Sequence, residues 1–571
     1  MHGIVGESSR MWREKVAPRY ASIREIPANR YRKTQRVSET DIIVIGGGSA
    51  GAAMTGRLAS AGLNVTLVEA GVSDQHFRSR IPALTSSIVQ NPAFDWCYQV
   101  EPDESLGGRA DIWPAGKLLG GGSALNGMMF IRGHRWDYDN WRALGAAGWD
   151  YESVLPYFRR MEDNERGADA WRGTGGPIAV SEGRARYPIT DAWIAAAEQT
   201  GIERRDLNGE KAEGVDYVQV SQRDGTRCSS ARGYLHEFKG STPPRTLLGA
   251  QVLRVLIEHG RAVGIAYLQD GEEKKLLARH GVILSAGAMN TPRLLMLSGV
   301  GPAGHLAEVG VPLVCNREGV GRNLQDHVGT HIVNAVSAHT LNDDARGLRG
   351  ALSVFRYALS RQGALSTSIG HAQAFVKSRP GLPAPNLQLS FAAFAFDFDD
   401  QGRLMLRKNA SVSTLVGLMR PSYRGRITLK SADPMAPPVI HHQQLSTEDD
   451  VDQIVEGIAM ARNILAQTPI APFITEELRP GPALTGKEEL RSYVRAAAIP
   501  MFHPVGTAKI GAATDPMAVV DPDLQVIGVN GLWVADASIF PSLPAGNTNA
   551  TAIMVGDKGA DHVLKTLRRN T

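Results

Sequence analysis

The sequence predicts an α/β (α+β) fold, in which a Rossmann-like nucleotide-binding domain is joined to a second domain with helices and a mainly antiparallel sheet. Two observations predict it. The segment DIIVIGGGSAG runs four aliphatic residues directly into Gly46-x-Gly48-x-x-Gly51, a spacing typical of a strand, a tight turn and a helix. The middle of the chain instead alternates polar and apolar residues, at 387–391 and at 424–429, as half-buried strands do.

The first element is a βαβ unit that predicts a dinucleotide site. Residues 42–45 form a buried strand, glycine allows the tight turn, and a helix begins near Ser49 with its free N–H groups toward a pyrophosphate. A second strand, 65–68, leads to Glu69. This acid lies 69 − 46 = 23 residues beyond the first glycine, close to the roughly 20-residue interval at which a carboxylate can accept hydrogen bonds from an adenosine ribose. The unit alone leaves FAD and NAD open, and a purely structural turn is the alternative.

Size and composition describe a large globular protein. With 571 residues, 43% of them hydrophobic, the chain is expected to form two or more domains, because single cores stop growing near about 250 to 300 residues. Its 62 basic and 58 acidic residues leave a net charge of +4, which favours neither a nucleic-acid nor a membrane partner. No apolar stretch approaches the roughly 20 residues of a membrane-spanning helix.

Cysteine usage and the N-terminal segment indicate a cytoplasmic protein. Cys97, Cys228 and Cys315 form no CxxC pair and have no neighbouring histidine cluster, so we expect reduced thiols and no metal site. Residues 1–40 are rich in Arg and Lys and lack the apolar core of a secretory signal. A solvated arm is the favoured interpretation, a transit peptide is the alternative, and peripheral membrane association stays open.

A second glycine-rich segment, PAGKLLGGGSALNGMMFIRG at 114–133, predicts a loop that lies against a planar ligand. Its three consecutive glycines, Gly120 to Gly122, followed by Ser123 and Asn126, offer a flat backbone with several N–H donors. A plain flexible loop is the alternative. The apolar stretch 124–131 is expected to be buried.

A short aliphatic strand at 282–284 leads into SAGAMNTPRLLMLSGVGP, which contains a predicted helix. We expect this helix to begin at Thr291, with the Thr291 side chain as its cap and Pro292 in its first position. Gly299 is expected to end it.

The C-terminal segments predict a histidine close to a helix N-terminus. The proline after His503 biases it toward an extended conformation, which restricts the directions of the imidazole. A last strand, 532–534, leads to Asp536, and Thr548 is expected to cap a long helix with Asn547 beside its start. That helix end can stabilise negative charge. Taken alone, such a histidine is more often structural.

Together these segments resemble the glucose-methanol-choline oxidoreductases, flavoproteins that oxidise alcohols. The likeness covers nearly the whole chain after residue 40, and residues 1–40 have no counterpart. The segments that match the family are its first signature at 116–126, continuing to Phe130, Gly133 and Asp139, its second signature at 287–295 and 298–301, VGRNLQDH at 320–327, the run 420–425, and HPVGT at 503–507.

The resemblance implies FAD as the cofactor and His503 with Asn547 as the catalytic pair; the family has His or Asn at the second position. The residues implied to hold FAD are Gly46, Gly48, Ser49, Gly51, Glu69, Lys117, Gly121, Gly122, Ser123, Asn126, Val252, Ala286, Asp536, Ala537, Asn547 and Thr548. Some members bind FAD covalently through a histidine near the first signature. Because 113–117 contain no histidine, we expect non-covalent FAD. Asp557 replaces a usual Glu in the last helix, a change that we expect to be harmless.

The implied reaction is the FAD-dependent oxidation of a primary alcohol to an aldehyde. Neutral His503 would remove the hydroxyl proton while a hydride moves to flavin N5, and Asn547 would hydrogen-bond the substrate oxygen. The alcohol, the oligomeric state and the electron acceptor, which is O₂ or a quinone or cytochrome, are left open. The alternative is a lyase or photodecarboxylase of the same fold that uses the flavin non-oxidatively. A nicotinamide dehydrogenase and a non-catalytic flavin-binding protein are weaker alternatives.

Aromatic residues near these segments have two interpretations each. Phe502 is expected either to line the pocket or to belong to the core. Phe394, Phe396 and Phe398 alternate as on a strand and are expected to pack within the sheet, although they could instead face the substrate. In the packing interpretation, Asp397 and Asp399 point to solvent.

The predicted domain division has three parts. Residues 1–40 form an N-terminal extension. The FAD-binding domain is discontinuous and comprises 41–160, 222–330 and 500–571, and the substrate-binding domain comprises 161–221 and 331–499.

Overall fold

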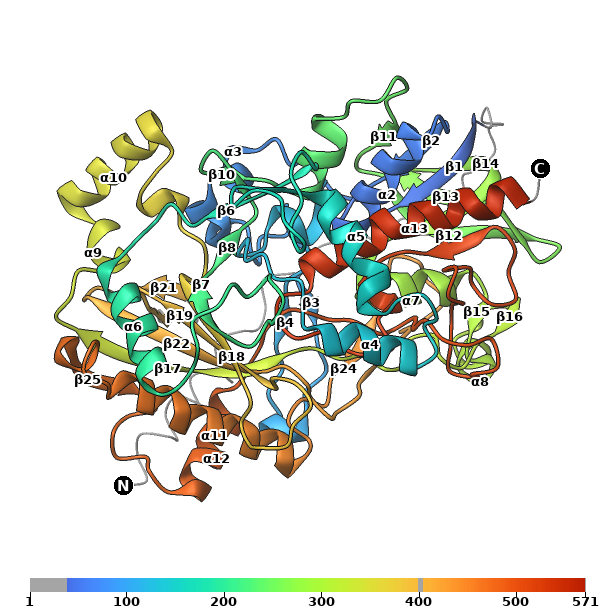
Figure 1. The fold of residues 1–571 in the computed structure, drawn as a ribbon. Coiled ribbons are helices and arrows are strands. Elements are labelled where there is room, and N and C mark those ends of the chain that lie inside the picture. Colours follow the sequence, from blue (N-terminus) through green and yellow to red (C-terminus); the bar gives the residue numbers. More distant parts are fainter. Residues whose placement is uncertain (1–37, 399–403, 570–571) are drawn as a thin grey trace.

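A computed structural model of the protein describes residues 38–398 and 404–569, and its strands form two seven-stranded sheets (Figure 1). The predicted arm at 1–40 lies outside the described residues except for 38–40, which begin the first strand. The strands of the first sheet are, in spatial order, β11 (Arg245–Leu247), β2 (Val65–Val68), β1 (Ser38–Ile45), β14 (Glu272–Leu284), β13 (Arg261–Gln269) and β12 (Gln251–Glu258), with β27 (Leu532–Val534) paired to β14.

The central part of the first sheet is parallel, as the buried aliphatic segments predict. β2, β1, β14 and β27 run in the same direction, with Ile45 opposite Leu284 and Leu284 opposite Val534. All four predicted strands are confirmed. β14 is longer than the predicted 282–284, because its first half forms an antiparallel pair with β13.

Two helices cover this sheet where the sequence predicts them. α2 (Ser49–Ser60) follows the glycine turn, and α13 (Asn549–Arg569) follows Thr548. They pack closely along the upper right of Figure 1, with α5 (Tyr151–Met161) beside α13. A Cβ atom on Gly556 would lie 2.2 Å from the Ala50 carbonyl oxygen, so this close approach of the two helices requires glycine.

The helix predicted to begin at Thr291 begins four residues earlier, as α7 (Gly287–Leu297). Thr291 is not its cap, and Pro292 lies inside the helix. The first turn of α7 is fixed by a carboxylate that is distant in the sequence. Asp536 accepts hydrogen bonds from Gly287 N and from Thr291 Oγ1, at 2.9 and 2.6 Å. Pro292 cannot donate to the carbonyl of Ala288, and the Thr507 hydroxyl donates to that carbonyl instead, at 2.6 Å. Tertiary contacts therefore overrule the local helix signals.

The second sheet is antiparallel, as predicted for the middle of the chain. Its strands are, in spatial order, β25 (Ile474–Arg479), β17 (Val328–Val336), β22 (Ser411–Leu418), β19 (Leu387–Ala392), β18 (Ala372–Val376) and β7 (Gly214–Tyr217), with β26 (Ile499–Pro500) paired to β17. The predicted strand at 387–391 is thus confirmed as β19. The segment 424–429 contributes only β23 (Arg426–Thr428), which pairs with β24 (Val439–His441) outside the main sheet.

Helices pack against this sheet, and others lie around the two sheets. Those that contact its strands are α6 (Pro188–Gln199), α11 (Glu448–Leu465) and α12 (Lys487–Ala497). The others are α3 (Phe77–Arg80), α4 (Arg135–Ala143), α8 (Ala303–Glu308), α9 (Leu341–Asp344) and α10 (Gly347–Ser360). The two sheets have separate hydrophobic cores. The division into domains at the predicted boundaries stays a prediction.

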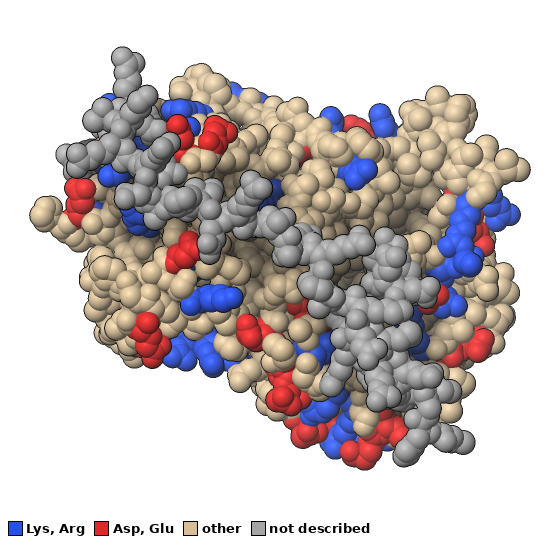
Figure 2. Space-filling view, turned by 180° about the vertical axis from the view of Figure 1, so that it is seen from behind, with Lys and Arg blue, Asp and Glu red and all other residues tan. Residues whose placement is uncertain are grey.

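The surface carries both signs of charge. On the face seen in Figure 2, basic and acidic side chains are interspersed, in keeping with the net charge of +4. Within 38–398 and 404–569, no helix combines the length and the apolar character that crossing a membrane requires.

Candidate active site

The predicted cofactor residues gather where the parallel strands end. Glu69 directly follows β2, Gly46 follows β1, Ser285 follows β14, and Asp536 comes two residues after β27. Gly46 has φ +94°, and a Cβ atom on it would lie 2.4 Å from the carbonyl oxygen of Ser285 and 3.0 Å from Ala286 Cα. In open α/β sheets this edge is where ligands bind.

Glu69 lies at this edge of the first sheet, directly after β2. Its carboxylate accepts hydrogen bonds from Gly47 N and Gly71 N, both at 2.8 Å. Burial raises the pKa of the Glu69 carboxyl, and these amides and Lys117 act in the opposite direction. Ala250 N donates to the Glu69 carbonyl at 3.0 Å, and Val252 follows two residues later in β12. Each carboxylate oxygen can still accept another hydrogen bond, as contact with a ribose requires.

The N-terminus of α2 has free backbone N–H groups that can bind an anion. Its N-cap is Gly48, no side chain caps it, and its first turn contains no acid. The Ser49 hydroxyl donates to Asn549 Oδ1 at 2.7 Å, so α2 and α13 begin side by side. Uncapped backbone N–H groups at a helix start, next to glycine, fit a pyrophosphate.

The second glycine segment lies directly on the first. Gly120 N donates to the Gly47 carbonyl at 2.7 Å, and a Cβ atom on Gly121 would lie 2.7 Å from Gly48 Cα. A Cβ atom on Gly122 would meet nothing within 4 Å, so this glycine borders open space. The predicted buried stretch 124–131 is confirmed except at 126 and 127, which are half-buried. The two glycine loops thus form a cradle for a phosphate-bearing planar group.

Ser123 and Lys117 make internal contacts in this loop. The Ser123 hydroxyl donates to the Gly120 carbonyl and accepts from Ser230 N. The Lys117 ammonium lies 4.7 Å from the centre of the Trp96 ring.

Arg227 holds the loop, and sequence reasoning missed it. The Arg227 side chain is buried, donates to Asn126 Oδ1 at 2.8 Å and to the carbonyls of Ser79, Ser123 and Asn126, and also contacts Thr85. Burial lowers its pKa to about 9. No local pattern could reveal this role, because the acceptors come from separate segments.

The predicted catalytic pair is in direct contact. Asn547 Nδ2 lies 3.0 Å from His503 Nε2, although the residues come from two segments, and both are half-buried. His503 N donates to Asp326 Oδ1 at 2.6 Å, which fixes the backbone beside the imidazole. Asn547 lies just before α13, whose first residue contacts Ser49. The pair is therefore close to the glycine cradle.

His327 contacts the His503 imidazole at the ring nitrogen that does not face Asn547. Its Nδ1 atom lies 2.9 Å from His503 Nδ1, with the two rings nearly perpendicular. If the Asn547 amide donates to His503 Nε2, then His503 carries its proton on Nδ1 and donates it to His327. Burial lowers the pKa of His503 to about 4 and lowers that of His327 well below its usual range. This assignment leaves Nε2 of His503 as an unprotonated base at neutral pH.

The Asn547 segment is held from several sides. Gly546 N donates to the Met419 sulfur at 3.2 Å, and a Cβ atom on Gly546 (φ +87°) would lie 2.5 Å from Ile131. The segment that contains Ile131 is fixed by Asn208, whose side chain donates to the Phe130 carbonyl and accepts from the Arg132 amide, each at 3.0 Å.

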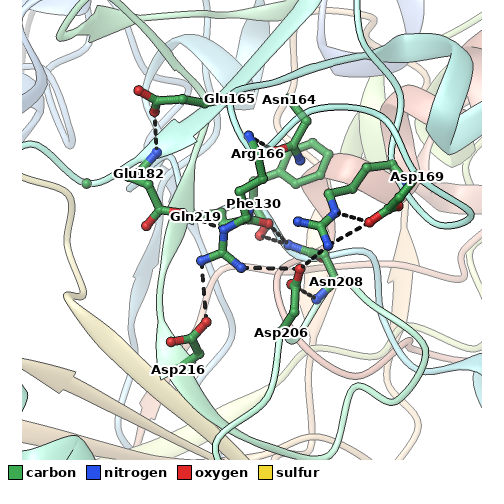
Figure 3. Close-up of polar contacts among 12 residues, drawn as sticks. Phe130, Asn164, Glu165, Arg166, Asp169, Glu182, Asp206, Asn208, Asp216 and Gln219 are labelled. Carbon is green, nitrogen blue, oxygen red and sulfur yellow. Dashed lines mark hydrogen bonds and ion pairs between the residues drawn. The ribbon is translucent and has the colours of Figure 1, made fainter.

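The network in Figure 3 extends this support to the surface. Asp206 Oδ1 accepts from Asn208 N at 2.9 Å, and Asp206 Oδ2 lies 3.2 Å from Arg166. Arg166 also pairs with Glu182 and Asp216. The loop that contains Asp206 and Asn208 is therefore linked by ion pairs through Arg166 to Glu182 and Asp216.

Comparison with known proteins decides the family. Two protein-family sequence models described as GMC oxidoreductase match residues 40–329 and 421–556 of the chain. The chain belongs to the GMC oxidoreductase family.

Relatives of this GMC oxidoreductase cover nearly its whole length. It is 39% identical over 529 residues to an oxygen-dependent choline dehydrogenase of Brucella canis (strain ATCC 23365 / NCTC 10854 / RM-666), a match that covers 92% of the chain and 96% of the relative. It is 39% identical over 545 residues to the mitochondrial choline dehydrogenase of Mus musculus, covering 94% and 91%. Among solved structures, pyridoxine 4-oxidase from Mesorbium loti has a TM-score of 0.81 at 26% identity, covering 91% and 98%.

The GMC oxidoreductase is an FAD-dependent enzyme that acts on CH–OH donors. The residues present fit FAD, because the uncapped start of α2 and the open side of Gly122 lie where the parallel strands end. Of the predicted cofactor residues, Asp536 is already bonded to the start of α7 and to Ser538 N, and the Ala537 carbonyl accepts from Gly506 N at 3.1 Å. Thr548 lies half-buried beside Asn547. Their roles toward FAD stay predictions.

The aromatic residues divide between surface and core. Phe502 is 42% exposed, so the core interpretation is wrong for it. Phe394 is buried, with its ring centre 5.3 Å from Phe396 and 5.7 Å from His371. Asp397 is partly exposed and pairs with Arg407 at 2.6 Å. The Phe398 side chain and Asp399 lie outside the described residues.

Proposed function

We propose that this GMC oxidoreductase converts a primary alcohol to an aldehyde, with His503 as the base and Asn547 as the residue that orients the substrate oxygen. The observation that supports it is the 3.0 Å contact between His503 Nε2 and Asn547 Nδ2 next to the glycine cradle. An alcohol C–H bond is a poor hydride donor until the hydroxyl proton leaves, so a base is needed at this point. General base catalysis contributes about 10²- to 10⁴-fold in rate.

FAD, when bound, supplies the hydride acceptor. The residues that would hold it without a covalent bond are the glycine turn of α2, Glu69, the loop at 116–126 and the segment around Asp536. Burial keeps the His503 imidazole neutral at pH 7. Nε2 has one lone pair, so an alcohol hydroxyl would displace the Asn547 amide hydrogen from it, and Nε2 can then accept the hydroxyl proton. His327 and Asp326 fix the imidazole through its Nδ1 atom and its backbone. Asn547 can then direct an amide hydrogen or its oxygen toward the alcohol.

Choline is the first alcohol to test, because the relatives that match over most of the chain are choline dehydrogenases. The test is anaerobic mixing with a panel of primary alcohols, choline included, while the flavin absorbance is recorded. We expect bleaching with at least one alcohol. Light-dependent product formation from a carboxylic acid, without bleaching by any alcohol, would instead favour the photodecarboxylase alternative. Admission of air afterwards distinguishes O₂ from a quinone or cytochrome as the acceptor, since only an oxidase is reoxidised rapidly.

A variant pair tests the role of His503. In His503→Gln we expect the rate of flavin bleaching to fall by about 10²- to 10⁴-fold with unchanged flavin content. His280→Gln, on β14, is the matched control and should bleach at the parental rate. A parental rate in His503→Gln removes this histidine from the proposed role.

We also propose that the enzyme acts in the cytoplasm. The three cysteines are free thiols, as a reducing compartment would keep them.

A further inference from the structure

The α10 helix presents its apolar side outward, the reverse of an ordinary surface helix. Leu348, Leu352, Phe355 and Leu359 recur at intervals of four, three and four residues, so they lie on one face. These side chains are 86%, 64%, 63% and 73% exposed, respectively. We call this set the α10 apolar face. A surface helix usually buries such a stripe in the core.

The opposite side of α10 attaches the helix to the protein. Tyr357 is the buried residue of the helix, and its hydroxyl donates to the Gly225 carbonyl at 3.0 Å. The Ser353 hydroxyl donates to the Asp344 carbonyl at 3.1 Å. The orientation of α10 is therefore set by contacts with the rest of the chain, and these contacts turn the α10 apolar face away from it. In Figure 1 the helix projects at one edge of the molecule, away from both sheets.

Basic residues border the α10 apolar face. Arg349 and Arg356 lie on the helix beside it, and Arg346 and Arg361 lie at its two ends. All four are exposed, and within the described parts of the chain none of them forms an ion pair with a carboxylate. The sequence contains no Asp or Glu from 345 to 396. Asp343 and Asp344, just before the helix, lie within ion-pair distance of His339. An apolar stripe bordered by four arginines complements a surface that is apolar inside and anionic outside.

We propose that α10 is an interfacial helix that docks the enzyme on the surface of an anionic lipid bilayer. Leu348, Leu352, Phe355 and Leu359 would enter the boundary between headgroups and acyl chains, and the arginine side chains would contact lipid phosphates. Charge disfavours a second copy of the chain as the occupant, because a symmetric contact would bring Arg349 and Arg356 of both copies together without acids to pair them. A docked enzyme would also lie next to any lipid-soluble electron acceptor.

Vesicle binding by the full-length holoenzyme tests the proposal. The probes are vesicles of phosphatidylcholine with a minority of phosphatidylglycerol, and vesicles of phosphatidylcholine alone. We expect stronger sedimentation with the anionic vesicles and release by salt, since the arginines act through screened charge.

Two variants separate the α10 apolar face from exposed apolar residues elsewhere. Leu352→Glu should lower the vesicle partition coefficient at least about tenfold, because a carboxylate would enter the acyl boundary. The matched control is Leu313→Glu, a residue 51% exposed on another part of the surface, which should bind as the parent does. Flavin content should be unchanged in both.

Arginine variants test the charge. Arg349→Gln and Arg356→Gln should each reduce binding to anionic vesicles about fivefold and leave binding to neutral vesicles nearly unchanged. No binding to either vesicle, or equal losses in Leu352→Glu and Leu313→Glu, overturns the proposal. So does a dimer, seen by sedimentation velocity without vesicle binding, that Leu352→Glu dissociates, because the α10 apolar face would then be an interface between copies.

Discussion

Replacing Asn547 by Asp places a negative charge next to the proposed base and is expected to move its titration into the working pH range. The amide nitrogen lies 3.0 Å from His503 Nε2. At an effective dielectric constant of about 20, two unit charges at this separation attract by about 5 kcal/mol. At about 1.4 kcal/mol for each pKa unit, this equals about four units.

The net shift is smaller, because the new carboxylate also loses hydration. Taking about half of the attraction, we expect the pKa of His503, which burial lowers to about 4, to rise by about two units or more. The carboxylate and the imidazole then take up one proton as a coupled pair. At pH 6 to 7 a substantial fraction of Asn547→Asp would carry this proton, so fewer molecules could accept one from the alcohol.

The assay is the pH dependence of kcat/KM, or of the anaerobic bleaching rate, between pH 5 and 9. The parent should show no acid limb at the usual histidine pKa, whereas Asn547→Asp should show one near pH 6 to 7. The control Asn547→Leu removes the amide without adding charge. It should lower the rate about tenfold to a hundredfold without introducing an acid limb between pH 5 and 9. An unchanged pH profile in Asn547→Asp would refute the contact on which the mechanism depends.

Three other predictions concern the scaffold around the site. Thr507→Val leaves the buried Ala288 carbonyl without its donor and should lower the free energy of unfolding by about 1 to 3 kcal/mol, measured by urea titration; no change would mean that the carbonyl has another donor. Gly121→Ala should strongly reduce the flavin content of the purified protein, because its Cβ would lie 2.7 Å from Gly48 Cα, whereas Gly304→Ala, where a Cβ meets nothing within 4 Å, should retain full flavin. Stability should fall between about pH 6.5 and pH 4, because histidines whose folded pKa is depressed bind protons more readily when unfolded, up to about 3 kcal/mol for each. The histidines concerned are His331, His371 and His503. Thermal unfolding at several pH values checks this last expectation, and a melting temperature that does not change between pH 6.5 and pH 4 would contradict it.

The segments that the sequence predicts well are those in which every determinant is local. The βαβ unit from β1 to β2 is one, because a run of aliphatic residues, glycines with special backbone requirements and a closing Glu69 all lie within a short stretch. The start of α13 after Thr548 is another. His503 and Asn547 could be proposed as partners only from the family resemblance, and their contact in space was a prediction until the structure brought them together.

Residues that depend on distant partners could not be predicted in this way. Arg227 is buried by segments that converge on it from several parts of the chain. His327 lies in a motif that the sequence analysis matched to the family, yet its contact with His503 spans a long interval of sequence. Helix α7 begins where Asp536 accepts from Gly287 N, and local signals placed its start at Thr291.

The sequence by itself determined the nucleotide-binding unit, the antiparallel character of the middle segment and the family, because these depend on periodicity, turn chemistry and motif spacing along the chain. Only the tertiary structure decided which side chains surround His503, where α7 begins and which side of α10 faces outward. The physical reason is that burial, pKa and hydrogen-bond partners depend on which groups are neighbours in space, and α10 shows this most directly. Its pattern is that of an ordinary amphipathic helix, and the contact of Tyr357 with Gly225 turns its apolar face outward.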